Sequence, residues 1–236
     1  MPNYDILINE TKNYLQLDET SIQRFKTYSE MLIEWNEKVN LTAITEPNDV
    51  IIKHFLDCLL TFKNFNIPNG ASVIDVGTGA GFPGMVLKIA RPDIKLTLLD
   101  GLNKRLVFLA ELCEKLGFRD VNIIHSRAED GAKKPELREQ FDFATARAVA
   151  KLNVLSEYCL PYVKVGGTFL ALKGPTAQEE LQGAKNAFRV LGAEFSAKVN
   201  ENLPNGDERV FVAVKKVSQT PTNYPRISAK IQKKPL

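Results

Sequence analysis

Apolar side chains in the first 66 residues recur at intervals of three and four, the spacing of one buried face of a helix. This spacing predicts one amphipathic helix from about residue 22 to 39 and a second over 50–62. We expect the two to form a helical cap over residues 1–66. The apolar positions of the first helix are Ile22, Phe25, Tyr28, Leu32, Trp35 and Val39.

From residue 71 onward the pattern alternates between short apolar runs and helical spacing. Such alternation predicts a doubly wound, mostly parallel sheet with helices on both faces. After the helix near 176–191, two further strands joined by a polar loop predict an antiparallel hairpin, which gives an α/β core of seven strands over residues 67–217. The strands are expected near 72–76, 95–99, 121–125, 141–146, 168–172, 194–199 and 209–217.

The run from Ser72 to Gly84 leads an apolar strand into a glycine-rich turn, and residues 85–90 then have helical character. Glycines remove side chains where a ligand meets backbone amides. A dinucleotide fingerprint can be read from Gly79 to Gly84, but the strand closes at Gly77, and that frame puts Phe82 where the third glycine belongs. An acid at the strand end, Asp75, followed by G-x-G-x-G instead resembles the cofactor loop of class I S-adenosylmethionine-dependent methyltransferases. A glycine turn without a ligand is the alternative.

Asp100 ends the next predicted strand, roughly 20 residues beyond the glycines, which is the spacing at which a carboxylate meets ribose hydroxyls. We therefore predict that Asp100 binds the ribose of a nucleoside. The alternative for this residue is a helix N-cap, since residues 104–112 have the spacing of a helix.

The composition fits a sizeable core in a reducing compartment. The chain has 236 residues, of which 44% are hydrophobic, and its three cysteines are far apart in the sequence. An odd, scattered set of cysteines indicates neither a disulfide framework nor a metal cluster. No targeting or membrane segment is evident. We therefore expect a cytoplasmic protein that binds no metal.

The charge is unevenly distributed along the chain. Residues 209–236 hold seven basic residues and no acid, whereas residues 1–208 hold 24 basic against 28 acidic residues. A basic tail over 218–236 suits a phosphate backbone, so we predict RNA contacts there and expect the tail to carry little of the fold. A solvated, disordered terminus is the alternative. The predicted contacts are Arg226, Lys230, Lys233 and Lys234, close to Tyr224.

Seven sequence blocks, in order, resemble the bacterial small-subunit ribosomal RNA guanine-N7 methyltransferase family, also called glucose-inhibited division protein B. The resemblance covers essentially the whole chain and implies a Rossmann-like class I methyltransferase fold. It also implies methyl transfer from S-adenosylmethionine to N7 of one guanine in 16S ribosomal RNA, either in the free RNA or within an assembling small subunit. The blocks are Asn36–Thr42, His54–Asp57, Asp75–Gly84, Ser126–Glu129, Ala146–Ala148, Leu172–Gly174 and Tyr224–Arg226.

The resemblance also implies where the cofactor binds. The implied contacts are Gly77, Gly79, Phe82, Ala128, Glu129 and Arg147. Arg147 either holds the cofactor carboxylate or orients the guanine. Neither the Asn/Asp-Pro-Pro-aromatic turn of amine methylation nor a cysteine nucleophile follows the fourth strand. Guanine N7 carries a lone pair and no proton, so Arg147 is expected to position the reactants without any general base.

Several polar residues keep two interpretations, one functional and one structural. His54 and Asp57 lie on one helical face and serve either the substrate side or a buried pair. Asn36 and Asn40 serve function or loop bonding, and Lys173 and Arg209 are plausible RNA or guanine contacts. The tail departs from the family at Ala229 and Ile231.

Two other functions compete with this assignment. One is a non-catalytic protein that senses the cofactor and binds RNA, and the other is a methyltransferase with a non-RNA substrate. The intact glycine loop and Asp100 count against the first, and the basic tail counts against the second.

Overall fold

A computed structural model of the chain describes residues 2–236 and contains one seven-stranded sheet in the order β3-β2-β1-β4-β5-β7-β6. The first five strands run parallel, and β7 lies antiparallel between β5 and β6. This confirms the predicted fold class, including the terminal hairpin. The strands are β1 Ser72–Val76, β2 Lys95–Asp100, β3 Asn122–His125, β4 Phe141–Arg147, β5 Val163–Lys173, β6 Ala193–Asn202 and β7 Glu208–Lys216.

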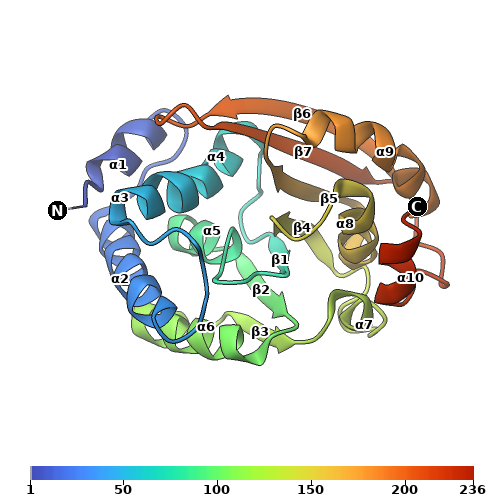
Figure 1. Cartoon of the computed structure of the whole chain (residues 1–236), viewed down its shortest axis with the longest axis horizontal. Helices are drawn as coiled ribbons and strands as arrows, with labels where there is room; N and C mark the ends of the chain where they lie inside the picture. The colour runs from blue at the N-terminus through green and yellow to red at the C-terminus, as the bar shows by residue number, and fades with distance from the viewer. Residues whose placement is uncertain (1) are drawn as a thin grey trace.

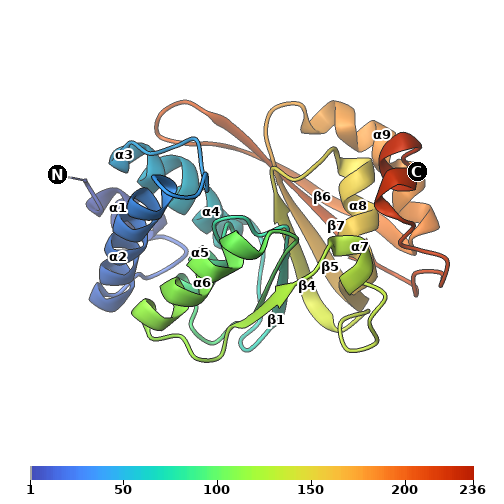
Figure 2. The same cartoon turned by 60° about the horizontal axis from the view of Figure 1, so that its bottom comes forward.

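Helices cover both faces of this sheet (Figures 1 and 2). One side holds the cap helices together with α5 and α6, and the other holds α7 to α10. The first group is α1 Asp5–Thr11, α2 Glu19–Asn36, α3 Pro47–Val50, a π-helical turn Ile51–Leu56, α4 Asp57–Asn64, α5 Gly84–Ala90 and α6 Asn103–Leu116. The second is α7 Ala128–Gly131, α8 Leu152–Cys159, a 3-10 turn Leu160–Tyr162, α9 Ala177–Val190 and α10 Ser228–Lys233.

The apolar face of α2 packs on the core and not on the cap alone. Phe25 and Tyr28 are fully buried, and Tyr28 stacks on Phe82 of the glycine-rich loop with ring centroids 5.3 Å apart. Phe108 of α6 lies 6.4 Å from the same tyrosine ring. One hydrophobic cluster therefore crosses the boundary at residue 66, and the division into cap and core stays a prediction.

The predicted helix over 50–62 is continuous in the structure but contains a π-helical turn at Ile51–Leu56. Such turns are rare and often lie at functional sites, because the extra residue redirects side chains. Here the turn carries Lys53 and His54, which both line a cavity described below. The spacing of apolar residues predicted the helix, but it gave no sign of the π-helical turn within it.

The basic tail packs against the domain, so the expectation that it carries little of the fold is wrong. Ile231 of α10 is fully buried among the apolar residues of α8 and α9. Arg138 donates hydrogen bonds to backbone carbonyls of the tail, including that of Tyr224 at 2.9 Å. Arg226 lies against Glu157 of α8, with Nη2 to Oε2 at 2.6 Å. The sequence showed the charges of this segment, whereas a single buried isoleucine gives no periodic signal.

Within residues 2–236, no helix combines the length and the hydropathy needed to cross a membrane.

Candidate functional site

The glycine-rich loop runs from the end of β1 to the start of α5 and is tied to the neighbouring strand. The Gly77 amide donates to the Leu99 carbonyl of β2 at 2.8 Å. Gly81 has φ +103°, and a Cβ there would lie 2.6 Å from Tyr28 Oη. Glycine is therefore required at this position by both the backbone conformation and the packing of the cap.

Asp75 braces this loop from inside the protein. It is fully buried, and its Oδ2 accepts from Thr78 Oγ1 at 2.6 Å and from the Gly84 amide at 3.0 Å. Thr145 Oγ1 of β4 donates to the other carboxylate oxygen at 3.2 Å. Burial raises the pKa of Asp75 to about 6, against the opposing effect of these hydrogen bonds. Both carboxylate oxygens are thus used within the chain, and its direct contact with a cofactor stays a prediction.

Asp100 stands at the end of β2 beside the same loop. Its Oδ2 accepts from the Gly79 amide at 2.9 Å, and its Oδ1 accepts from the Leu102 amide at 2.8 Å. Arg105 Nη1 lies 3.5 Å from Oδ2, while Arg105 Nε is buried without a hydrogen-bond partner within residues 2–236. The carboxylate is therefore fixed against the glycine loop at the mouth of a cavity.

A cavity of about 440 Å³ opens between the glycine loop, Asp100 and the cap. It brings together most of the cofactor contacts that the sequence predicts: Gly77, Gly79, Phe82, Asp100 and Arg147. Backbone without side chains, a carboxylate and an aromatic ring around one space suit a nucleoside that carries an amino-acid group. The structure adds Thr42, Arg105 and Val149 to its walls, and no spacing in the sequence singled these out.

Ala128 and Glu129 lie on α7, outside the walls of this cavity. Glu129 is buried, and Tyr162 Oη donates to the Ala128 carbonyl at 2.7 Å. The segment begins next to the end of β2, where the Ser126 amide donates to the Asp100 carbonyl at 3.1 Å. The structure therefore places this pair beside the predicted ribose end, and its contact with the cofactor stays a prediction.

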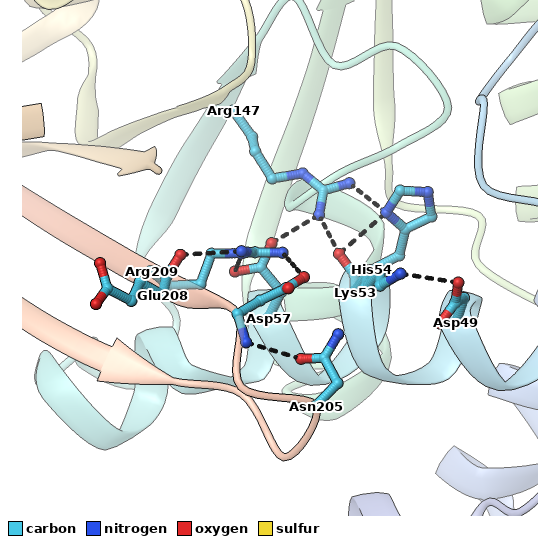
Figure 3. A network of polar contacts seen from close by, with 9 residues as sticks. Asp49, Lys53, His54, Asp57, Arg147, Asn205, Glu208 and Arg209 are labelled. Atoms are coloured by element: carbon cyan, nitrogen blue, oxygen red, sulfur yellow. Dashed lines mark hydrogen bonds and ion pairs between the residues drawn. The ribbon is translucent and has the colours of Figure 1, made fainter. Parts of the chain in front are cut away.

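Arg147, at the end of β4, is held by the cap helix (Figure 3). Its Nη1 donates to the Lys53 carbonyl at 3.1 Å and to Asp57 Oδ2 at 3.0 Å, and its Nη2 lies 3.0 Å from His54 Nδ1. The guanidinium carbon also lies 4.7 Å from the centre of the Phe82 ring. The orientation of Arg147 is thus fixed before any ligand binds.

His54 is held in its neutral form. The guanidinium donates to Nδ1, so the proton of the neutral ring lies on Nε2, which is 2.8 Å from Thr42 Oγ1. Burial first, and then the charge of Arg147, lower the pKa of His54 to about 3. The ring packs on Phe82 at 4.4 Å. A histidine in this environment is a poor general base near neutral pH, which favours the structural interpretation of this residue.

Asp57 lies between two guanidinium groups. Its Oδ2 pairs with Arg147, and its Oδ1 lies 3.3 Å from Arg209 Nε of β7, although the angle there does not make a hydrogen bond. Asp57 is also buried. Its charge is compensated by the two cations, which together link the cap, β4 and the hairpin.

A second cavity of about 330 Å³ adjoins the first and shares His54, Arg147 and Ala148 with it. It is lined by polar side chains that include Lys173 and Arg209. Lys173 Nζ pairs with Glu180 at 2.8 Å and donates to the Ala150 carbonyl at 2.9 Å. The two cavities therefore meet at Arg147, one beside the glycine loop and one beside these cations.

Of the two asparagines, Asn36 has a visible structural role. Its Oδ1 accepts from the Leu41 amide at 2.7 Å and the Thr42 amide at 2.9 Å, which fixes the loop that carries Thr42 to His54. Asn40 is exposed. Among the side chains of residues 2–236, no group of three or more His, Cys, Asp or Glu could hold a metal ion.

The strand order and the hairpin are those of the class I S-adenosylmethionine-dependent methyltransferase fold, and the family match reported below confirms the predicted enzyme class and cofactor. The fold is shared with a SAM-dependent methyltransferase from Aquifex aeolicus, with a TM-score of 0.52 and 21% identity, covering 77% of this chain and 97% of that one. It is also shared with TYW2 from M. jannaschii in complex with AdoMet, with a TM-score of 0.52 and 14% identity, covering 64% of this chain and 72% of that one.

The chain belongs to the GidB family, described as rRNA small subunit methyltransferase G, whose sequence model matches residues 21–205. A ribosomal RNA small subunit methyltransferase G of Clostridium perfringens (strain 13 / Type A) is 51% identical over 94% of this chain and 93% of its own length. The protein of the same description from Clostridium beijerinckii is 46% identical over the whole of both chains. The family predicted from the seven sequence blocks is thereby confirmed.

Proposed function

We propose that this chain transfers a methyl group from S-adenosylmethionine to N7 of a specific guanine in 16S ribosomal RNA. The observation that supports this best is the meeting of two cavities at Arg147, where His54 is held neutral by burial and by the arginine. A reaction that needs a proton removed would be poorly served there. Methylation of an unprotonated ring nitrogen needs none.

The first cavity fits the cofactor, which supplies an electrophilic methyl group on a sulfonium when bound. Gly77 and Gly79 offer backbone without side chains, Asp100 offers a carboxylate to the ribose, and Phe82 covers one wall. The cofactor would reach Ala128 and Glu129 from the side of the cavity that Asp100 lines. Asp75 acts through the loop conformation that it braces.

The second cavity fits the guanine. Arg147 is clamped by Asp57, His54 and a backbone carbonyl, so it can orient the base without reorganising. In the reaction the N7 lone pair forms a bond to the methyl carbon as the carbon–sulfur bond breaks, and no proton moves. Alignment of these three atoms supplies the rate. Arg147 is on this account the catalytic residue, by positioning.

Lys173 and Arg209 are proposed to contact the RNA at the edge of the second cavity. Both already pair with carboxylates, Lys173 with Glu180 and Arg209 with Asp57, so they present a fixed and partly neutralised surface. Arg226 forms an ion pair with Glu157, which favours a structural role for this arginine over the predicted phosphate contact. The substrate is proposed to be ribosomal RNA in the cytoplasm, either free or within an assembling subunit.

The test is mass spectrometry of 16S ribosomal RNA from cells that lack the gene, before and after treatment with the purified protein and cofactor. We expect one 7-methylguanine to be missing and then restored. N2- or N1-methylguanine in its place would refute the assignment. An RNA unchanged by loss of the gene would favour the non-catalytic, cofactor-sensing alternative or a non-RNA substrate.

The pH dependence of single-turnover methylation tests the absence of a base. We expect a flat rate from about pH 6.5 to 8.5, because neither guanine N7 nor His54 changes protonation there. A rate that falls tenfold for each pH unit below neutrality would show that a titrating base is required.

A further inference from the structure

Three cations project from the edge of the sheet where the cofactor cavity opens. Lys104 lies at the start of α6 after β2, Arg127 follows β3, and Lys151 follows β4. All three side chains are exposed, and within residues 2–236 none has a carboxylate oxygen within 4.0 Å. We call these three residues the rim.

The cations that line the two cavities, including Arg147 with Asp57, are already paired with carboxylates, and so have less charge to offer a ligand. An unpaired, exposed cation is the more effective partner for a phosphate, because no ion pair has to be broken first. The paired cations are Lys53 with Asp49, Lys173 with Glu180, Arg209 with Asp57 and Arg105 with Asp100.

The three rim residues follow strands that end at the same edge of the sheet. The loops after β2 and β3 touch, since His125 Nε2 lies 3.1 Å from the Gly101 carbonyl and Arg127 Cγ lies 3.8 Å from the Cβ position of Gly101. The strand order places the ends of β3, β2 and β4 on the same edge, around β1 and its glycine loop. Lys151 stands just before α8, two positions after Val149 in the chain.

Apolar side chains lie exposed on the same loops. Leu102 is 46% exposed and lies two positions before Lys104, and Val149 is 39% exposed and lies two positions before Lys151. Val149 also lines the cofactor cavity. Cations alternating with exposed apolar groups suit single-stranded RNA, whose phosphates and unstacked base faces both need partners.

The tail offers a contrasting arrangement. Arg226 is taken up by Glu157 and Ile231 is buried, so this segment is built into the domain. In both views α10 lies on the flank of the molecule opposite the cap, beyond α8 (Figures 1 and 2). Lys230, Lys233 and Lys234 are exposed there, but on the outside of the helix layer.

We infer that the rim, and not the tail, holds the phosphate backbone of the RNA next to the target base. This inference rests on the proposed function, in that the substrate is RNA. It assigns the phosphate contacts to Lys104, Arg127 and Lys151 and leaves the tail lysines as a solvated surface of a structural segment.

Two triple variants that remove the same charge give a matched test. One is Lys104→Gln, Arg127→Gln and Lys151→Gln, and the other is Lys230→Gln, Lys233→Gln and Lys234→Gln. Binding of an unmodified 16S ribosomal RNA transcript would be measured by filter binding from 50 to 200 mM KCl. For three lost phosphate contacts, the salt slope of the rim variant should flatten by roughly 2 to 3 units. The affinity lost across this salt range would then shrink by roughly 16- to 64-fold, and the tail variant should keep the wild-type slope.

Cofactor binding and methylation separate this inference from the proposed function. Calorimetry with S-adenosylhomocysteine should give a Kd within twofold of wild type for both variants. Wild-type methylation of 16S ribosomal RNA with an unchanged rim slope would overturn the inference alone, as would equal flattening in both variants. A flattened rim slope without methylation by the wild type would instead leave the rim standing and refute the proposed reaction. Flattening in the tail variant alone would restore the tail as the RNA contact.

Discussion

Arg226→Ala should destabilise the protein strongly, because it leaves a buried carboxylate without its partner. Glu157 is fully buried on α8 and accepts from Arg226 through Nε at 2.9 Å, through Nη2 at 2.6 Å and through the backbone amide at 2.8 Å. The substitution keeps only the amide. Removing one partner of a buried ion pair costs about 3 kcal/mol at the lower end of the usual range, and the 13% exposure of Arg226 places it there.

For a chain of this length, 1 kcal/mol shifts the melting temperature by about 2–4 °C, so we expect a loss of roughly 6–12 °C by calorimetry or circular dichroism. The double variant Glu157→Leu with Arg226→Leu removes the unpaired charge as well and should recover most of that loss. Cofactor affinity serves as the control. An Arg226→Ala protein that melts like wild type but shows a flatter salt slope for RNA would refute the reasoning, and would return Arg226 to the phosphate contacts that the sequence predicted.

Three further perturbations test the site. Gly79 has φ +60°, so Gly79→Arg should abolish cofactor binding and cost about 1–2 kcal/mol of stability. The control Gly183→Arg, with open space around it on α9, should bind the cofactor normally. Calorimetry compares the two variants, and normal cofactor binding by both would contradict the assignment of the loop. The pKa of His54 lies at about 3, below its unfolded value of 6.5, so the unfolded chain takes up this proton first and the free energy of unfolding falls as the pH drops from 6.5 toward 3. His54→Gln should remove up to about 1 kcal/mol per pH unit from the slope of the free energy of unfolding against pH, measured by urea titrations between pH 6 and 4.5. An unchanged slope would show that His54 is exposed to water in the folded protein. Glu180 accepts a hydrogen bond from the Leu152 amide at 2.8 Å and pairs with Lys173, whose position it fixes. Glu180→Ala should therefore lower the single-turnover rate roughly tenfold or more and leave the cofactor Kd within twofold. A rate like that of wild type would show that these contacts of Glu180 do not align the guanine.

The strands and the glycine loop could be predicted from the sequence because each leaves a local pattern. The apolar run before Asp75 and the acid at Asp100 are short-range signals, and both residues lie where the pattern placed them, beside one loop. The contacts that orient Arg147 could not be predicted in this way. They join residues about 90 positions apart, and no spacing in a single sequence encodes such a pair.

Charge alone was misleading in the tail. The run of basic residues after Glu208 predicted a phosphate contact, but the fate of Arg226 depends on a buried acid 69 residues earlier in the chain. The same limit applied to the rim, whose three cations lie far apart in the sequence and gather only because parallel strands end at one edge of a sheet. Individually, each resembles an ordinary surface residue.

Tyr28 of α2 stacks on Phe82 and donates a hydrogen bond to the Ala80 carbonyl at 2.5 Å. These contacts determine when α2 can complete its packing during synthesis of the chain. At a synthesis rate of about 5–20 residues per second, the residues up to Phe108 that complete the packing of α2 are made roughly 4–16 seconds after α2 itself. Until then its apolar face is covered only in part, by Phe55, whose ring centroid lies 4.9 Å from that of Phe25 and 5.3 Å from that of Tyr28. The first helices to leave the ribosome therefore reach their final packing only after α6 has followed, and a fragment that ends near residue 66 would leave Tyr28 without Phe82 and Phe108 and favour self-association.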